Sequence, residues 1–126
     1  MSDKEEEIKV INIQLITLLI ALVSAIISII ITYNQKLDLE NKNTIDPRKI
    51  YNITVFNRIL ILILSLVFLY VNYKLYKISK KEGEDLKPYI LQIIASILTI
   101  IASIIAIYIV SLSTKENIVD VENPII

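Results

Sequence analysis

The chain has 126 residues, of which 55% are hydrophobic and 21% charged, and its formal net charge is zero. Its mean hydropathy of +0.64 is too high for an ordinary soluble domain of this size, and no basic block suggests a nucleic-acid partner. The absence of histidine and cysteine and the single glycine exclude Ser-His, Cys-His and glycine-rich phosphate sites. We therefore expect no enzyme, metal or cofactor, and predict an all-α integral membrane protein with three transmembrane helices.

The first predicted element follows an acidic amino-terminal arm over residues 1–9. No charge occurs between Lys9 and Lys36, a run of 26 residues, whereas about 20 apolar helical residues cross the hydrocarbon core of a bilayer. The start of the chain lacks the basic residues of a signal peptide, and no small-residue cleavage site follows the run. We predict a retained membrane helix over residues 10–33, followed by a polar loop over residues 34–46.

The second predicted element is longer than a membrane span. Asp46 and Pro47 are typical of an N-cap and a first helical position, and Gly83 is typical of a helix stop. A helix over residues 47–82 would be about 54 Å long, so it should extend beyond a hydrocarbon core of about 30 Å. We place its membrane part at about residues 52–76. Its extension carries lysines that suit anionic lipid headgroups: Lys74, Lys77, Lys80 and Lys81.

The third predicted element follows a short loop over residues 83–87. Pro88 opens an uncharged run that ends before Lys115, and we predict a membrane helix over residues 88–112 and an acidic tail over residues 113–126. The three spans predict a small antiparallel helical bundle. A soluble three-helix bundle is the alternative, but it would need polar faces that the first and third helices lack.

Tyrosines and lysines give further information about the membrane boundaries. Aromatic residues with a polar end prefer the headgroup level, so the tyrosines near the predicted helix ends are expected to be membrane anchors. These are Tyr33, Tyr51 and Tyr108 on one face, and Tyr73, Tyr76 and Tyr89 on the other. The face with the amino terminus carries seven basic residues against five on the opposite face, which favours a cytoplasmic amino terminus.

Small and weakly polar residues form one face on the first and on the third predicted helix. Such faces let helix backbones approach closely in lipid, where no hydrophobic effect drives association. In the first helix the face contains Thr17, Ala21, Ser24, Ala25 and Ser28. In the third helix it contains Ala95, Ser96, Thr99, Ala102, Ser103 and Ala106, beside Gln92. We predict that both faces are helix-packing surfaces.

The second helix carries a narrower polar stripe. Arg58, Ser65, Asn72 and Ser79 are spaced by seven residues, which places them on one side of a helix. We expect this side to face inward, toward the other helices, and Ser65 to pack against them. Judged by depth from the predicted helix ends, three amides should form a polar cluster: Gln14, Asn72 and Gln92. A ligand site or polar path is one interpretation; interhelical hydrogen bonds of about 0.6 kcal/mol each are the simpler one.

Arg58 is the charged residue at the start of an uncharged run of 15 residues, 59–73. Because this run spans only about 22 Å, Arg58 should lie at the hydrocarbon edge. The predicted spans contain no Asp or Glu, so a buried ion pair within them is excluded. We expect an anchor whose side chain reaches lipid phosphates or the carboxylates of the first loop or the tail. A ring of such arginines lining an oligomeric pore is the alternative.

Two function classes follow. The first is a non-enzymatic structural or accessory subunit that assembles, through its small-residue faces, with itself or with another membrane protein. The second is an oligomeric pore former, channel-like or holin-like, because the length, the three spans and the weakly polar faces resemble those of the three-span phage holins. That resemblance concerns topology, and the acidic tail departs from the basic tail usual in those proteins.

Overall fold

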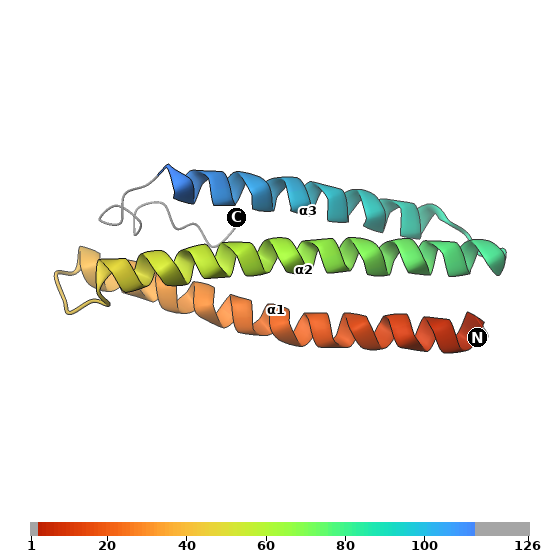
Figure 1. Ribbon diagram of the computed structural model, residues 1–126, viewed down its shortest axis with the longest axis horizontal. Helices are drawn as coiled ribbons and strands as arrows, with labels where there is room; N and C mark the ends of the chain where they lie inside the picture. Colours follow the sequence, from red (N-terminus) through yellow and green to blue (C-terminus); the bar gives the residue numbers. More distant parts are fainter. Residues whose placement is uncertain (1–2, 113–126) are drawn as a thin grey trace.

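The computed structural model describes residues 3–112, which form three α-helices: α1 (Asp3–Leu39), α2 (Pro47–Lys81) and α3 (Lys87–Ser111). α2 lies in the middle, and α1 and α3 pack antiparallel to it on either side (Figure 1). Within residues 3–112, α1 and α3 do not pack against each other. The predicted all-α fold with three long apolar helices is confirmed. The predicted tail, residues 113–126, lies outside the described residues.

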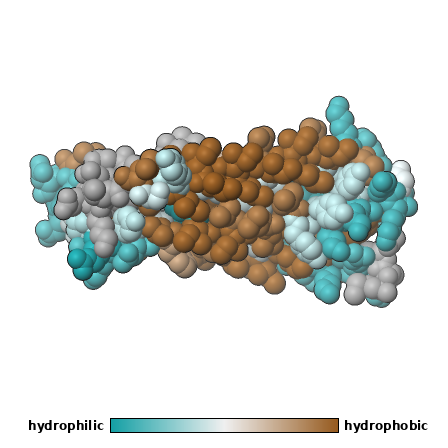
Figure 2. Space-filling model, turned by 45° about the horizontal axis from the view of Figure 1, so that its top comes forward, coloured by the Kyte–Doolittle hydropathy of each residue, from teal (hydrophilic) through white to brown (hydrophobic). Residues whose placement is uncertain are grey.

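Many of the large apolar side chains of the bundle face outward. Each helix is long and apolar enough to cross a membrane, and a continuous apolar band separates two polar ends of the molecule (Figure 2). Large aliphatic residues are widely exposed, for example Leu19 at 65% and Leu98 at 61%. A soluble bundle would bury such residues instead. The helices therefore indicate a small multi-pass membrane protein in contact with a lipid bilayer.

α1 is longer at both ends than the predicted span of residues 10–33. No proline or glycine interrupts the chain between Asp3 and Leu39, and the glutamates near its start suit the positive end of the helix dipole. The helix stops where Asn41 adopts a left-handed backbone conformation with a φ of 57°. There the Lys42 N–H donates to the Leu37 carbonyl oxygen at 2.9 Å, the bond of a Schellman motif. The first six residues of the predicted loop are consequently helical.

α2 begins and ends with strong local signals. The Asp46 side chain accepts a hydrogen bond from the Arg48 N–H at 3.2 Å, and Pro47 occupies the first helical position. At the other end Gly83 has a φ of 71°, and the Glu84 N–H donates to the Ser79 carbonyl oxygen at 3.1 Å. This is a second Schellman motif, and it ends the helix one residue before the predicted limit.

Gly83→Ala is expected to lower the free energy of unfolding by about 1 kcal/mol, because a Cβ disfavours the left-handed conformation. No heavy atom lies within 4 Å of the position of that Cβ, so the loss would be conformational rather than steric. Thermal unfolding in mild detergent, followed by circular dichroism, measures it. Gly83→Asn is the control and should retain more of the stability, because asparagine tolerates this conformation, as Asn41 does. Equal losses in both variants would contradict the explanation.

The axial register of α2 and α3 follows from a close contact in the middle of their interface. The hydroxyl oxygens of Ser65 and Ser103 lie 3.4 Å apart. Because the two helices are antiparallel, Arg58, seven residues before Ser65, is level with Val110, seven residues after Ser103. Both residues line one small cavity. Arg58 therefore lies beside the last turn of α3, which ends at Ser111.

The axial register of α1 against α2 differs from that of α3 against α2. Asn57 of α2 contacts both Ser24 and Ser28, near the middle of the uncharged stretch over residues 10–35. Arg58, the next residue of α2, is thus level with the middle of the apolar part of α1 and with the end of α3. The apolar stretches of the two outer helices are staggered along α2. The hairpin of α1 and α2 extends beyond α3 at one end of the molecule (Figure 1).

Candidate functional site

Within residues 3–112, no group of three or more His, Cys, Asp or Glu side chains could hold a metal ion. The features that bear on function are instead the polar contacts between the helices, the surroundings of Arg58 and an open groove above α2. Each of them combines residues from at least two helices.

The contact between α1 and α2 centres on Asn57, whose side chain is 1% exposed. The Ser24 hydroxyl donates to Asn57 Oδ1 at 2.7 Å, and Asn57 Nδ2 donates to the Ser28 hydroxyl oxygen at 2.9 Å. One amide therefore joins two serines that lie one turn apart on α1. Asn57 was not among the residues predicted to matter from the sequence. The available signal was its seven-residue spacing from Ile50 and Leu64, which are also buried.

The contact between α2 and α3 uses the predicted polar stripe. Asn72 Nδ2 donates to the Ser96 hydroxyl oxygen at 2.6 Å. The hydroxyls of Ser65 and Ser103 each donate to a carbonyl oxygen of their own helix, at 2.8 Å in both cases. Because a hydroxyl has a single proton to donate, their 3.4 Å contact marks close packing of the helices more than a hydrogen bond. Small side chains thus set the distance between α2 and α3.

The three amides of the predicted polar cluster are only partly brought together. Asn72 Nδ2 lies 3.4 Å from the backbone carbonyl oxygen of Gln92, so this contact does not use the Gln92 amide group. Within residues 3–112, Gln14 makes no hydrogen bond to either residue. The Glu6–Lys74 ion pair shows the reason, because it places Gln14 at least about one helical turn deeper than Asn72.

Arg58 is buried between protein elements, with 4% of its surface exposed. It lines a cavity of about 110 Å³ with residues of α2 and of the last turns of α3. The lining consists of Tyr51, Val55, Arg58, Ile107, Val110 and Ser111. The carboxyl-terminal end of a helix carries a partial negative charge, so this position stabilises a guanidinium. As predicted, the polar stripe of α2 that contains Arg58 faces the other helices. The low exposure of Arg58 results from the packing of the last turns of α3 against it.

An open groove of about 780 Å³ is lined mainly by α1 and α2, and Thr99 closes it on the side of α3. Six predicted packing residues line it: Ala21, Ser24, Ala25, Ser28, Ser65 and Thr99. The rest of the lining is Ile29, Thr32, Tyr33, Lys36, Ile61, Leu64 and Phe68. Its walls are largely apolar, and Tyr33 and Lys36 lie toward the hairpin end. The groove exists because the two outer helices pack against α2 and not against each other.

The predicted packing faces are divided by this arrangement. One part of them is buried: Thr17 and Ser24 on α1, and Ser96, Ser103 and Ala106 on α3. Another part stays exposed: Ala25 on α1, and Ala95, Thr99 and Ala102 on α3. Ala21 and Ser28 are half-buried. Each face is therefore wider than its contact with α2 requires, and its exposed part includes two residues of the groove, Ala25 and Thr99.

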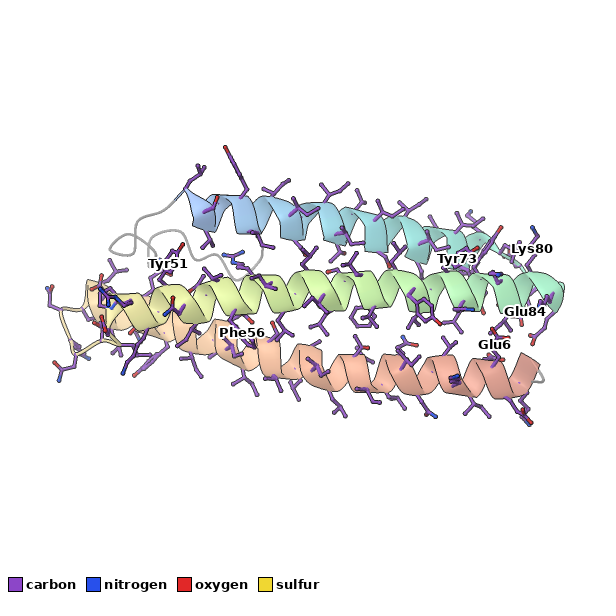
Figure 3. All side chains as sticks on the ribbon, in the orientation of Figure 1. Glu6, Tyr51, Phe56, Tyr73, Lys80 and Glu84 are labelled. Carbon is purple, nitrogen blue, oxygen red and sulfur yellow. The ribbon has the colours of Figure 1, made fainter. Side chains whose placement is uncertain are left out.

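Some of the predicted anchors lie at the two polar ends of the molecule. Glu6, Tyr73, Lys80 and Glu84 lie at one end, and Tyr51 lies near the other (Figure 3). Lysines stack on tyrosines at the first end: the ammonium of Lys74 lies 5.8 Å from the Tyr70 ring centre, and that of Lys77 lies 5.5 Å from the Tyr73 ring centre. Such pairs are weakly attractive when exposed. Lys80 and Lys81 are exposed, whereas Tyr76 and Tyr89 are half-buried.

At the hairpin end the stagger separates the predicted anchors along the axis. The register of α2 and α3 places Tyr108 level with Leu60, which is nine residues, or about 14 Å, along α2 from Tyr51. Tyr33 lies near the end of α1 instead. Tyr33 and Tyr108 are both exposed, and Tyr51 is half-buried. The three side chains do not mark a single level of the bundle.

Comparison of the chain with models of protein families, with curated proteins and with solved structures found no match. Function is therefore inferred from the geometry of the three helices.

Proposed function

We propose that the protein is a non-enzymatic subunit of a membrane assembly, which joins a second copy of itself or another membrane protein by accepting a transmembrane helix into the groove between α1 and α3. The observation that carries this proposal is the groove itself, whose α1 wall contains several small residues and whose α3 side is formed by Thr99. Ala25 of α1 and Thr99 of α3 are exposed there, while α1 and α3 stay apart.

The physics of helix association in lipid supports this role. Lipid tails are as apolar as leucine, so helices associate through close packing and interhelical hydrogen bonds, and small residues allow both. The contacts with α2 already use such residues, as Ser65 and Ser103 show. A helix in the groove would meet similar small residues on α1, together with Ser65 of α2 and Thr99 of α3. An additional helix would thus extend the packing that holds the bundle together.

Phenylalanine at Ala25 or Thr99 should fill the groove and release the partner helix. The expected result is a fall in the mass of the assembly purified in mild detergent, measured by native mass spectrometry, to that of the 14.4 kDa chain. Leu22→Phe and Leu98→Phe are matched controls, because both leucines are exposed neighbours outside the groove lining. These controls should leave the mass unchanged. A monomeric wild-type chain, or one mass for all four variants, would contradict the proposal.

The polar end with the lysines would lie against anionic headgroups. Exposed lysines near a membrane surface contribute about 1 kcal/mol each to binding of anionic lipids, and Lys77, Lys80 and Lys81 are exposed at this end. We place this end, and with it the amino terminus, on the cytoplasmic side, following the excess of basic residues. The oligomeric pore stays a prediction. Asn57 and Asn72, which could line a polar path, are hydrogen-bonded to α1 and α3 instead.

A further inference from the structure

α1 carries two lines of heptad-spaced residues, and only one of them is used for packing against α2. The packed line consists of buried residues seven apart: Val10, Thr17, Ser24 and Ile31. The second line lies about a quarter turn further around the helix, on the side of the groove. Its spacing alternates between three and four residues, as at the a and d positions of a coiled coil. We call it the open seam of α1: Ile11, Gln14, Leu18, Ala21, Ala25, Ser28 and Thr32.

The open seam differs in chemistry from the rest of the exposed surface of α1. Its last four residues are small or hydroxyl-bearing and line the groove: Ala21, Ala25, Ser28 and Thr32. The side of α1 that points away from both α2 and the groove carries bulky aliphatic residues, such as Leu19 and Ile26, which suit lipid tails. Small residues in lipid are typical of helix contacts. The open seam therefore has the composition of a surface that meets another helix.

Two polar groups on the open seam have no hydrogen-bond partner within residues 3–112. The hydroxyl oxygen of Thr32 is buried and unpaired, and Thr32 lines the groove. The Gln14 amide is half-buried and unpaired, although it lies within the uncharged stretch over residues 10–35. A polar group without a partner is unfavourable away from water. An amide both donates and accepts, so Gln14 can bond to the same residue of a second copy.

The charges at the two ends of the seam are complementary to those of a second copy. Glu7 continues the seam at its start, and Lys4 lies one turn before Glu7. At the other end Lys36 lines the groove, and Glu40 follows one turn later. In two identical parallel helices, each of these charges lies near an opposite charge of the other copy, and such flanking pairs set partner and orientation. The exposed Glu40–Lys42 contact of 3.8 Å within the chain is too weak to prevent this.

We propose that the helix in the groove is α1 of a second copy, in a dimer whose two-fold axis runs between the two α1 helices. This inference rests on the proposed function and names its partner. Both copies insert into the membrane in the same direction, so the two α1 helices are parallel and each open seam meets its own equivalent. Each α1 would then cover Ile61 and Phe68 of the other copy. α3 suits this place less, because it contributes only Thr99 to the groove and has no charge between residues 88 and 112.

Disulfide cross-linking of the full chain in lipid vesicles tests the dimer, and the chain contains no cysteine of its own. Ala21→Cys and Ala25→Cys place a single thiol on the open seam. Leu19→Cys is the matched control on the same helix, because Leu19 is 65% exposed and lies outside the groove lining. Linked dimers are followed over time on non-reducing gels. We expect both seam variants to link at least about tenfold faster than the control. Equal rates on the three positions would overturn the proposal.

Two further results separate this inference from the proposed function. Ala102→Cys places a thiol on an exposed small residue of α3, and faster linking there than at Ala25 would assign the contact to α3 and overturn the α1 dimer. Native mass spectrometry of the wild-type chain gives the second result. A complex with a different protein would also overturn the α1 dimer, yet both results would leave the proposed function standing. A monomer would overturn both.

Discussion

Replacing Ser103 by leucine should destabilise the bundle by about 1–3 kcal/mol, because it forces additional side-chain volume into a packed interface. Ser103 is 3% exposed, and its hydroxyl oxygen lies 3.4 Å from that of Ser65. A branched side chain at this position would push α3 away from α2 along the interface that small residues hold close. The measurement is the free energy of unfolding in mild detergent, titrated with a denaturing detergent.

Two further variants show whether packing is the cause. Ala102→Leu adds a similar side chain at an exposed neighbour, so we expect a change of no more than about 0.5 kcal/mol. Ser103→Ala removes the hydroxyl but keeps the volume small, and its hydrogen bond goes to Thr99 of the same helix. It should therefore be nearly neutral. If Ser103→Ala lowered the free energy of unfolding as much as Ser103→Leu does, the hydroxyl group would matter more than the small volume of the side chain.

Replacing Asn57 by leucine should lower the free energy of unfolding by about 1–2 kcal/mol, because two interhelical hydrogen bonds are lost. Hydrogen bonds between membrane helices average about 0.6 kcal/mol, with a maximum near 1.7 kcal/mol. Asn52→Leu is the control on the same helix, since Asn52 is exposed and should change stability little. The readout is again unfolding in mild detergent.

A double-mutant cycle separates the two hydrogen bonds of Asn57. Ser24→Ala and Ser28→Ala, each made in the wild-type chain and in the Asn57→Leu variant, give the coupling energy of each pair. We expect a coupling of roughly 0.6 kcal/mol or more for Ser24, whose contact with Asn57 is the shorter at 2.7 Å against 2.9 Å. Additive effects for both serines would mean that Asn57 acts through packing instead.

The number of helices and several of their ends could be predicted because these features depend on short stretches of sequence. Uncharged runs of 26 residues or more have a simple physical meaning in a bilayer. Asp46, Pro47 and Gly83 act through their own backbone and side-chain chemistry, so their roles did not depend on the fold. Asn41 acts in the same way as Gly83, and its position in a polar stretch was the signal for the true end of α1.

Contacts between helices were harder to predict, because they depend on the register of one helix against another. Gln14 was placed beside Asn72 on the assumption that the helix ends are flush, and the stagger of α1 separates them. Asn57 was missed because its importance comes from Ser24 and Ser28, more than 28 residues away in sequence. Arg58 was expected on an inward stripe, yet its surroundings depend on where α3 ends.

By itself, the sequence determined that this protein is all-α, that it has three helices able to cross a membrane, and which sides of those helices carry small or polar residues. These properties follow from hydropathy and from the 3.6-residue period of the helix, which are local. The tertiary structure alone decided that α2 separates α1 from α3, that the outer helices are staggered, and that a groove remains between them. The reason is that several small residues on each helix offer alternative registers of similar local chemistry, and only the packing of all three helices selects one.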